Sequence, residues 1–275
     1  MSYQEVLAQK TIAISISESP DMPALGLGEE HLRDAMAEIA RHFLALGARL
    51  IYGGDLRQQG FSELLFELVA RHVRDSDAGD NSTGVTNYLP WPVHIQTSVA
   101  ELEKQILDVK DTASIVCLNI DGSELPIYER RGFQSQMPTE KEWTDGLTSM
   151  RITMMSASDA RVVVGGRVEN YKGLMPGIAE ETLISLKAGK PTFLVGGFGG
   201  CARDIAELLG LISPRIKTAP MWSGHKEFKI FSVANLNNGL TDIENATLAY
   251  TPHIDQAIIL ILRGMVRLIK ANDQK

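Results

Sequence analysis

Short β-branched runs alternate with longer amphipathic stretches along the first 73 residues. Thr11–Ser17 is a mostly apolar, β-branched run, which predicts a strand. Gly28–Leu46 carries apolar residues at helical spacing and is followed by a glycine, which predicts a helix. Ala48–Tyr52 and Phe61–Val73 repeat the pattern of strand and helix. An order β-α-β-α predicts a parallel sheet with crossover helices.

A second set of alternating elements follows the same rules between residues 112 and 210. The expected strands are Thr112–Ile120, Arg161–Val164 and Lys190–Val195, and the expected helices are Pro138–Ser158, Pro176–Ala188 and residues 200–209. Together the two sets predict a Rossmann-like, doubly wound α/β fold, with a mostly parallel sheet and helices on both faces.

Three segments depart from this alternation. Arg74–Leu89 is rich in Asp, Gly, Ser and Asn, which predicts a long mobile loop. Trp91–Ile95 predicts a strand, at an edge because it contains Pro92. His253–Ala271 predicts a last helix that is apolar around much of its circumference and is therefore buried, in the core or against another subunit.

The chain shows no internal repeat and no clean linker between domains. We therefore expect one domain over residues 1–275, with its core at about 11–73 and 112–210 and elaborations at 74–111 and 211–275.

Charge and composition narrow the class of protein. The net charge is −7 and the isoelectric point is about 5.4, which argues against nucleic acid or an anionic membrane as partner. Two cysteines outside any CxxC motif and the lack of a signal-peptide pattern favour the cytoplasm. The six histidines show no metal-ligand spacing, so no metal is expected, and no apolar stretch is long enough for a membrane span.

Four turns follow predicted strands, and three of them contain a glycine pair. They are Ser15–Glu18, Gly53–Asp55, Gly165–Arg167 and Gly196–Gly200. Taken singly, each is also compatible with an ordinary tight turn. Since ligands of open α/β sheets bind beyond the carboxyl ends of the strands, the four turns together predict a ligand pocket at that edge.

Several charged residues accompany these turns. Arg57, Arg151 and Arg167 are candidates for phosphate binding, because a guanidinium matches a phosphate in bidentate geometry. Glu180 and Glu181 follow Gly177, where they suit either the helix dipole or the hydroxyls of a ribose. The candidate ligand-binding residues are Ser15, Ser17, Gly53, Gly54, Asp55, Arg57, Arg151, Gly165, Gly166, Arg167, Gly177, Glu180, Glu181, Gly197, Phe198 and Gly199.

These motifs resemble those of the SLOG superfamily over about residues 11–73 and 148–210. Tyr52–Asp55 is similar to the Tyr-Gly-Gly-Gly strand end of the LOG phosphoribohydrolases, and Met150–Met154 to their helix with an arginine and methionines. Ser158–Ala160, an apolar strand and Gly165-Gly166 are similar to the start of the motif Pro-Gly-Gly-x-Gly-Thr-x-x-Glu. Gly177–Glu181 is similar to its end. The superfamily also includes ligand-sensing domains of melastatin-type channels and of bacterial anti-phage effectors.

The chain departs from the LOG pattern at three places. The motif proline is Val164, the motif threonine is Ile178, and ten residues, Arg167–Pro176, are inserted between the two halves. In LOG enzymes an arginine and the motif glutamate are the catalytic pair, so the resemblance implies Arg151 and Glu181 in those roles if the chain is an enzyme. The insertion changes the pocket, which favours the sensing branches and their ligands derived from NAD.

Three functions follow from these observations. The first is a binding module for an ADP-ribose-like or AMP-like nucleotide that requires no cofactor and uses a homo-oligomer, a dimer or tetramer, to report binding. The second is an enzyme that cleaves or transfers an N-glycosidic bond with Glu181 and Arg151. The third is a structural subunit in which the last helix only mediates assembly.

Overall fold

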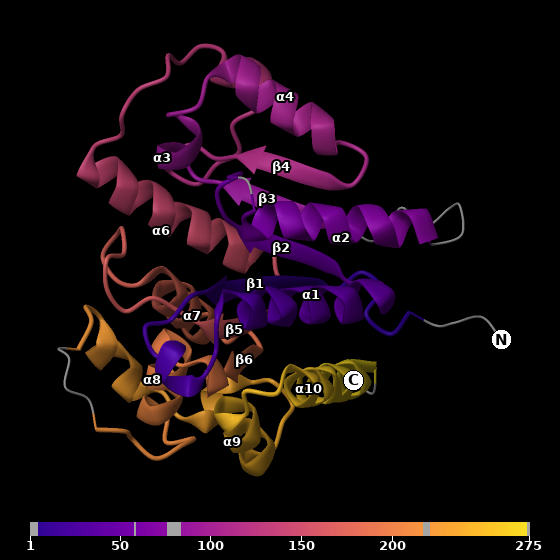
Figure 1. The fold of residues 1–275 in the computed structure, drawn as a ribbon, viewed down its shortest axis with the longest axis vertical. Coiled ribbons are helices and arrows are strands. Elements are labelled where there is room, and N and C mark those ends of the chain that lie inside the picture. Colours follow the sequence, from indigo (N-terminus) through magenta and orange to yellow (C-terminus); the bar gives the residue numbers. More distant parts are fainter. Residues whose placement is uncertain (1–4, 58, 76–83, 217–220, 274–275) are drawn as a thin grey trace. The chain divides into compact units, whose positions relative to one another are not determined.

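The computed structural model describes residues 5–57, 59–75, 84–216 and 221–273. Six strands form one sheet in the order β4-β3-β2-β1-β5-β6, and the neighbouring pairs in register are parallel (Figure 1). The strands are β1 (Thr11–Ser17), β2 (Arg49–Gly53), β3 (Val85–Leu89), β4 (Ala113–Cys117), β5 (Ala160–Gly165) and β6 (Thr192–Val195).

Helices connect these strands and follow the last one. The α-helices are α1 (Glu29–Ala45), α2 (Phe61–Asp75), α3 (Trp91–His94), α4 (Val99–Val109), α5 (Ile127–Arg130), α6 (Glu140–Ser156), α7 (Gly177–Lys187), α8 (Gly200–Leu208), α9 (Asp242–Tyr250) and α10 (Ile254–Asp273). The 3-10 helices are η1 (Pro23–Leu25), η2 (Gly196–Phe198), η3 (His225–Ile230) and η4 (Val233–Leu236). The parallel sheet and its helices confirm the predicted Rossmann-like, doubly wound α/β fold.

The chain divides into two compact units. Unit 1 comprises residues 1–13 and 40–158, and unit 2 comprises residues 14–39 and 159–275. The expectation of one domain over the whole chain stays a prediction.

Unit 1 packs helices on both faces of its strands. On one face, Ile51 and Tyr88 share an apolar cluster with Met150 and Met154 of α6. On the other face, Cys117 of β4 packs in a second cluster with residues of α3 and α4. Side chains that alternate along a strand point to opposite faces, and here both faces are buried, as a parallel sheet requires.

Unit 2 has its own core around β5 and β6. Val163 and Leu194 of these strands pack against apolar residues of α7 and α8. The inserted segment Arg167–Pro176 contains no helix or strand, but its Met175 belongs to the same core cluster and Tyr171 packs against it. The insertion is therefore anchored to unit 2 by apolar contacts.

Two predicted elements are wrong. Arg74–Leu89 is not one long loop, because β3 occupies its last five residues; residues 76–83 lie outside the described residues. The predicted strand Trp91–Ile95 is the short helix α3, in which Pro92 lies in the first turn, where its missing N–H leaves no hydrogen bond unmade.

Besides α3, three of the described α-helices, α4, α5 and α9, lie in segments for which no helix was predicted. Ser98 caps α4 by accepting a hydrogen bond from the Glu101 N–H at 3.2 Å, and Thr241 and Glu244 form a capping box at the start of α9. The helix α6 runs through Gly146 without interruption. A Cβ at Gly146 would lie 2.6 Å from Pro92, so the glycine allows α3 and α6 to pack closely.

Candidate functional site

The glycine pair after β5 serves close backbone packing in unit 2. Gly165 and Gly166 have φ angles of 65° and 113°, which favour glycine. A Cβ at Gly165 would lie 2.5 Å from the Ser17 carbonyl oxygen. The Gly166 N–H donates to that same oxygen at 3.0 Å, and the Cys201 N–H donates to the Gly166 oxygen at 3.2 Å. These bonds join the ends of β1 and β5 to the start of α8.

A buried charge cluster lies beside this turn, and we call Ser15, Arg161, Glu181 and Ser185 the Arg161 cluster. The Arg161 Nη1 donates to Ser15 Oγ and to Glu181 Oε2, each at 2.7 Å, and Nε donates to Ser185 Oγ at 2.8 Å. Ser15 also donates to Glu181. Arg161 is 0% exposed and Glu181 is 8% exposed. A buried ion pair needs such added hydrogen bonds to offset the cost of removing its charges from water.

Sequence reasoning missed Arg161. It follows Ala160 at the start of a strand that is otherwise wholly apolar and buried on both faces. A charged residue in such a strand is almost never fully buried unless it is paired, and this was the available signal for a buried carboxylate partner. Arg151, the residue that the LOG resemblance pairs with Glu181, lies in α6 of unit 1 and is 5% exposed. The catalytic pairing of Arg151 with Glu181 stays a prediction.

Exposed charged residues, Arg167 and Glu18, follow the ends of β5 and β1. The Arg167 N–H donates to Ser17 Oγ at 3.3 Å, and its guanidinium lies 3.3 Å from the Glu18 carboxylate. The side chains of Arg167 and Glu18 are both 53% exposed. Gly177 begins α7, and Glu180 lies in its first turn with 5% exposure.

The turn Gly196–Gly200 is filled by the chain itself. A Cβ at Gly197 would lie 2.0 Å from the Thr251 carbonyl oxygen, and Phe198 is 2% exposed. The Asp21 carboxylate accepts a hydrogen bond of 2.6 Å from the Gly200 N–H at the start of α8. These contacts explain the glycines by packing, and a ligand role for Gly197, Phe198 and Gly199 stays a prediction.

In unit 1, two buried polar side chains form hydrogen bonds with the backbone of the turn after β2. Asn87 donates to the Gly54 carbonyl oxygen at 3.0 Å, and the single hydroxyl proton of Ser62 is shared between two acceptors, Asn87 Oδ1 and the Asp55 carbonyl oxygen, each at 2.8 Å from Oγ. The side chains of Asp55 and Arg57 are 47% and 68% exposed and lie 3.2 Å apart. Buried hydrogen bonds thus fix two backbone carbonyls of the turn, while its charged side chains are exposed to solvent.

This turn borders a cavity of about 420 Å³, which we call the strand-end cavity. It lies at the carboxyl ends of β2 and β3, and of the four predicted turns only the one at Gly53–Asp55 contributes to its lining, so the joint pocket of the four turns stays a prediction. Asp55 and Arg57 are the two predicted site residues among its lining. The lining residues are Asp55, Leu56, Arg57, Leu89, Val93, His94, Thr97, Glu101, Leu102 and Gln105.

A neutral histidine forms part of the wall. His94 Nε2 donates to the Leu118 carbonyl oxygen at 2.9 Å, and its Nδ1 accepts from Arg130 Nε at 3.2 Å. Burial, the largest cause, and the positive charge of Arg130 lower the pKa of His94 from 6.5 to about 4. Arg130, which is 0% exposed, also donates to carbonyl oxygens of Phe133, His94, Ile95 and Thr97. The pair is therefore a structural support of the wall, with a single positive charge.

No group of three His, Cys, Asp or Glu side chains among the described residues could hold a metal ion. None of the helices in the part of the chain that the structure describes is long and apolar enough to cross a bilayer.

Comparison with known proteins identifies the family. No curated protein matches the chain. A family model described as SLOG cluster2 matches residues 6–238, which is most of the chain and includes both units' strand-end turns. The chain therefore belongs to the SLOG superfamily, in the group described as SLOG cluster2, and is a Rossmann-like domain of a nucleotide-related family.

Proposed function

We propose that the protein binds a phosphorylated nucleotide derived from NAD, of the ADP-ribose or cyclic ADP-ribose kind. The observation that carries the proposal is the strand-end cavity of about 420 Å³, which borders the glycine turn after β2. Cavities of about 300–1,000 Å³ at the carboxyl ends of parallel strands are typical small-molecule sites.

The lining chemistry suits the parts of a nucleotide. The exposed Arg57 guanidinium pairs with Asp55 through Nε, and its terminal N–H groups can form charge-assisted hydrogen bonds with phosphate oxygens. The carboxylates of Asp55 and Glu101 can accept hydrogen bonds from ribose hydroxyls. The partly exposed apolar residues of the lining, Leu56 and Val93, offer contact area to a base.

The Arg161 cluster favours binding over catalysis. A carboxylate that stabilises a cationic sugar transition state must direct its charge toward the sugar. Oε2 of Glu181 is instead engaged by Arg161 and Ser15. The N-glycosidase alternative, with Glu181 and Arg151 as the pair, is for this reason the second candidate.

Homo-oligomerisation and a cytoplasmic location complete the proposal. Helix α10 buries Ala257, Ile261 and Met265, while Ile259 is 58% exposed. The apolar residues of α10 are thus only partly used within the chain, which supports a dimer or tetramer. Light scattering tests it, and a monomer at all concentrations contradicts it.

The central test is ligand stabilisation followed by product analysis. The protein is incubated with NAD, ADP-ribose, cyclic ADP-ribose or AMP, and both the melting temperature and the released base are measured. We expect an NAD-derived nucleotide to raise the melting temperature through linkage, without release of base. We expect Arg57→Ala to lower the affinity for that ligand about tenfold, because it removes a charge-assisted hydrogen bond.

Arg71→Ala is the matched control. Arg71 is 69% exposed and pairs with Glu67 on α2, so it resembles Arg57 in exposure and pairing but does not line the cavity. Equal affinity of the two variants, or no stabilisation by any of the four nucleotides, contradicts the proposal. If the protein releases base and Glu181→Gln abolishes that release, the function is N-glycosidic cleavage and not binding alone.

A further inference from the structure

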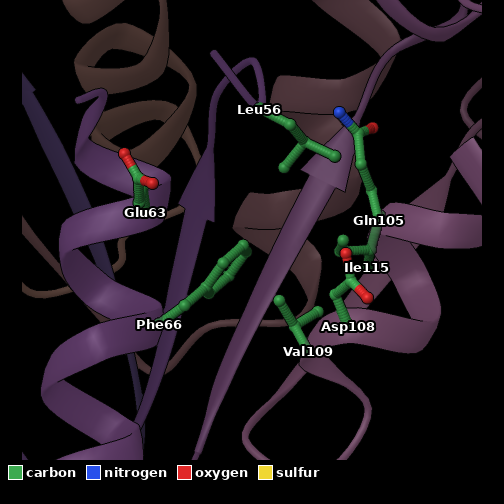
Figure 2. A pocket seen from close by; sticks show the side chains of 7 residues that line it. All are labelled: Leu56, Glu63, Phe66, Gln105, Asp108, Val109 and Ile115. Atoms are coloured by element: carbon green, nitrogen blue, oxygen red, sulfur yellow. The ribbon is translucent and has the colours of Figure 1, made fainter. Parts of the chain in front are cut away.

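A second, smaller pocket lies in unit 1 between two helices, and we call it the α2–α4 pocket. Glu63 and Phe66 reach it from α2, Asp108 and Val109 from α4, and Ile115 from β4 (Figure 2). Leu56 and Gln105 complete the lining (Figure 2). Figure 2 shows the two helices as opposite walls, with the Phe66 ring pointing into the space between them.

The pocket has the size and surface of a site for one aromatic ring. Its volume is about 160 Å³, and Leu56, Phe66, Val109 and Ile115 make much of its lining apolar. An engineered apolar cavity of about 150 Å³ in another protein holds one benzene molecule. A single ring therefore fits the volume and would be in contact with apolar side chains.

The charges of the lining select the sign of the occupant. Of the seven lining residues, Glu63 and Asp108 are acidic and none is basic. Glu63 accepts a hydrogen bond from the Gln59 N–H, which restrains the orientation of its carboxylate in the lining. An anion is repelled by two carboxylates, whereas a cation is attracted to them and to the face of the Phe66 ring.

We propose that the α2–α4 pocket is a binding site for a compact organic cation whose body is about one aromatic ring. The ring lies among Leu56, Phe66, Val109 and Ile115, and the cationic group lies toward Glu63 and Asp108. The apolar volume gives the affinity and the carboxylates give the preference for positive charge. The site needs no phosphate, and it adjoins the strand-end cavity, with which it shares Leu56 and Gln105 in the lining.

Three probes of equal ring size and different charge test the proposal: benzylammonium, benzyl alcohol and phenylacetate. Binding to the full chain is followed by ligand-observed NMR. We expect saturable binding of benzylammonium in the millimolar range, about fivefold weaker binding of benzyl alcohol, and no saturable binding of phenylacetate. In Glu63→Gln/Asp108→Asn the preference for benzylammonium over benzyl alcohol disappears. Glu67→Gln, which removes a charge from α2 outside the pocket, keeps it.

A second pair of variants locates the ring. Val109→Phe fills the pocket and should abolish binding of benzylammonium, whereas Leu107→Phe changes a 62% exposed residue of α4 outside the lining and should leave it intact. Circular dichroism checks that both variants fold. If Val109→Phe does not fold, Glu63→Gln/Asp108→Asn and its control Glu67→Gln still test the proposal independently.

No saturable binding of benzylammonium, equal binding of benzyl alcohol, or equal binding by the two phenylalanine variants overturns the proposal. Since the probes carry no phosphate, these results are separate from the nucleotide titrations with Arg57→Ala.

Discussion

Unit 1 and unit 2 both end a parallel strand in a glycine pair, but the surroundings of the two turns differ. In unit 2, a Cβ at Gly165 would meet a backbone oxygen of Ser17 at 2.5 Å. In unit 1, a Cβ at Gly53 would meet the flexible ends of two methionine side chains, Met154 at 2.5 Å and Met150 at 3.0 Å. The unit 1 turn continues into the exposed Asp55 and Arg57, which line a cavity. A glycine pair after a strand can therefore mark close packing of the chain or an open ligand site.

The two units also differ in the groups that neutralise a buried arginine. Arg130 of unit 1 and Arg161 of unit 2 are both 0% exposed. Arg130 is held by carbonyl oxygens and a neutral His94, while Arg161 is held by the carboxylate of Glu181. Unit 1 thus buries a cation among dipoles, and unit 2 buries an ion pair. The comparison predicts that charge removal and acidification affect the two units through different residues.

The largest effect is expected for Arg161→Met. The substitution leaves the Glu181 carboxylate buried without its cation, which costs about 3–5 kcal/mol of unfolding free energy. Urea unfolding measures this loss. Arg161→Met/Glu181→Leu, which replaces both charges by apolar groups, should recover much of it. If the single variant loses less than the double variant, the ion pair does not carry the stability of the Arg161 cluster.

The glycine pairs give the next prediction. Gly165→Ala places a Cβ against backbone at a positive φ of 65°, and we expect a loss of about 3 kcal/mol. Gly53→Ala meets methionine side chains that can move, and we expect a loss of about 1 kcal/mol. Both are measured by urea unfolding at pH 7. Equal losses would mean that the two turns are packed alike.

Acidification is expected to act on unit 1 through His94. The unfolded pKa is about 6.5 and the folded pKa is about 4, so the unfolded state binds more protons between these values. The resulting stability is full above pH 6.5 and is lost as the pH falls to about 4, by about 2–3 kcal/mol.

The measurement compares urea unfolding at pH 7 and pH 4.5. His94→Gln should reduce the difference in unfolding free energy between the two values, whereas His31→Gln, at a residue whose side chain is 47% exposed, should leave it unchanged. An unchanged pH difference in His94→Gln would show that His94 is not the group responsible.

The sequence predicts the alternating core well and fails where polar residues replace the expected pattern. In β3, Val85-Thr-Asn-Tyr-Leu89, Asn87 is completely buried because it bonds to Ser62 and Gly54, partners that are distant in the sequence. Local patterns could not show those partners. The same holds for Arg161, whose partner Glu181 lies one helix further along the chain.

Two other helices, α3 and α9, do carry local sequence signals. Pro92 in the first turn of α3 and the Thr241–Glu244 capping box of α9 are signs of helices that could be seen in the sequence. Asp55 and Arg57, which line the strand-end cavity, became candidates because they lie within three residues of a glycine pair, and their role as ligand contacts stays a prediction. Whether a glycine pair opens on a cavity depends on contacts such as that between Gly165 and Ser17, which no local pattern contains.

The smallest effect on stability is expected for the two exposed arginines of the turns. Arg57 pairs with Asp55 and Arg167 with Glu18, and both arginine side chains are more than half exposed, so either alanine variant should change the unfolding free energy by less than about 0.5 kcal/mol. Only Arg57 lines the strand-end cavity. Arg57→Ala should therefore weaken nucleotide binding while it leaves stability unchanged. Titration calorimetry measures the affinity of both variants. If Arg167→Ala causes the larger loss of affinity, the phosphate lies at the turn of unit 2, and that turn, not the turn of unit 1, is the ligand site.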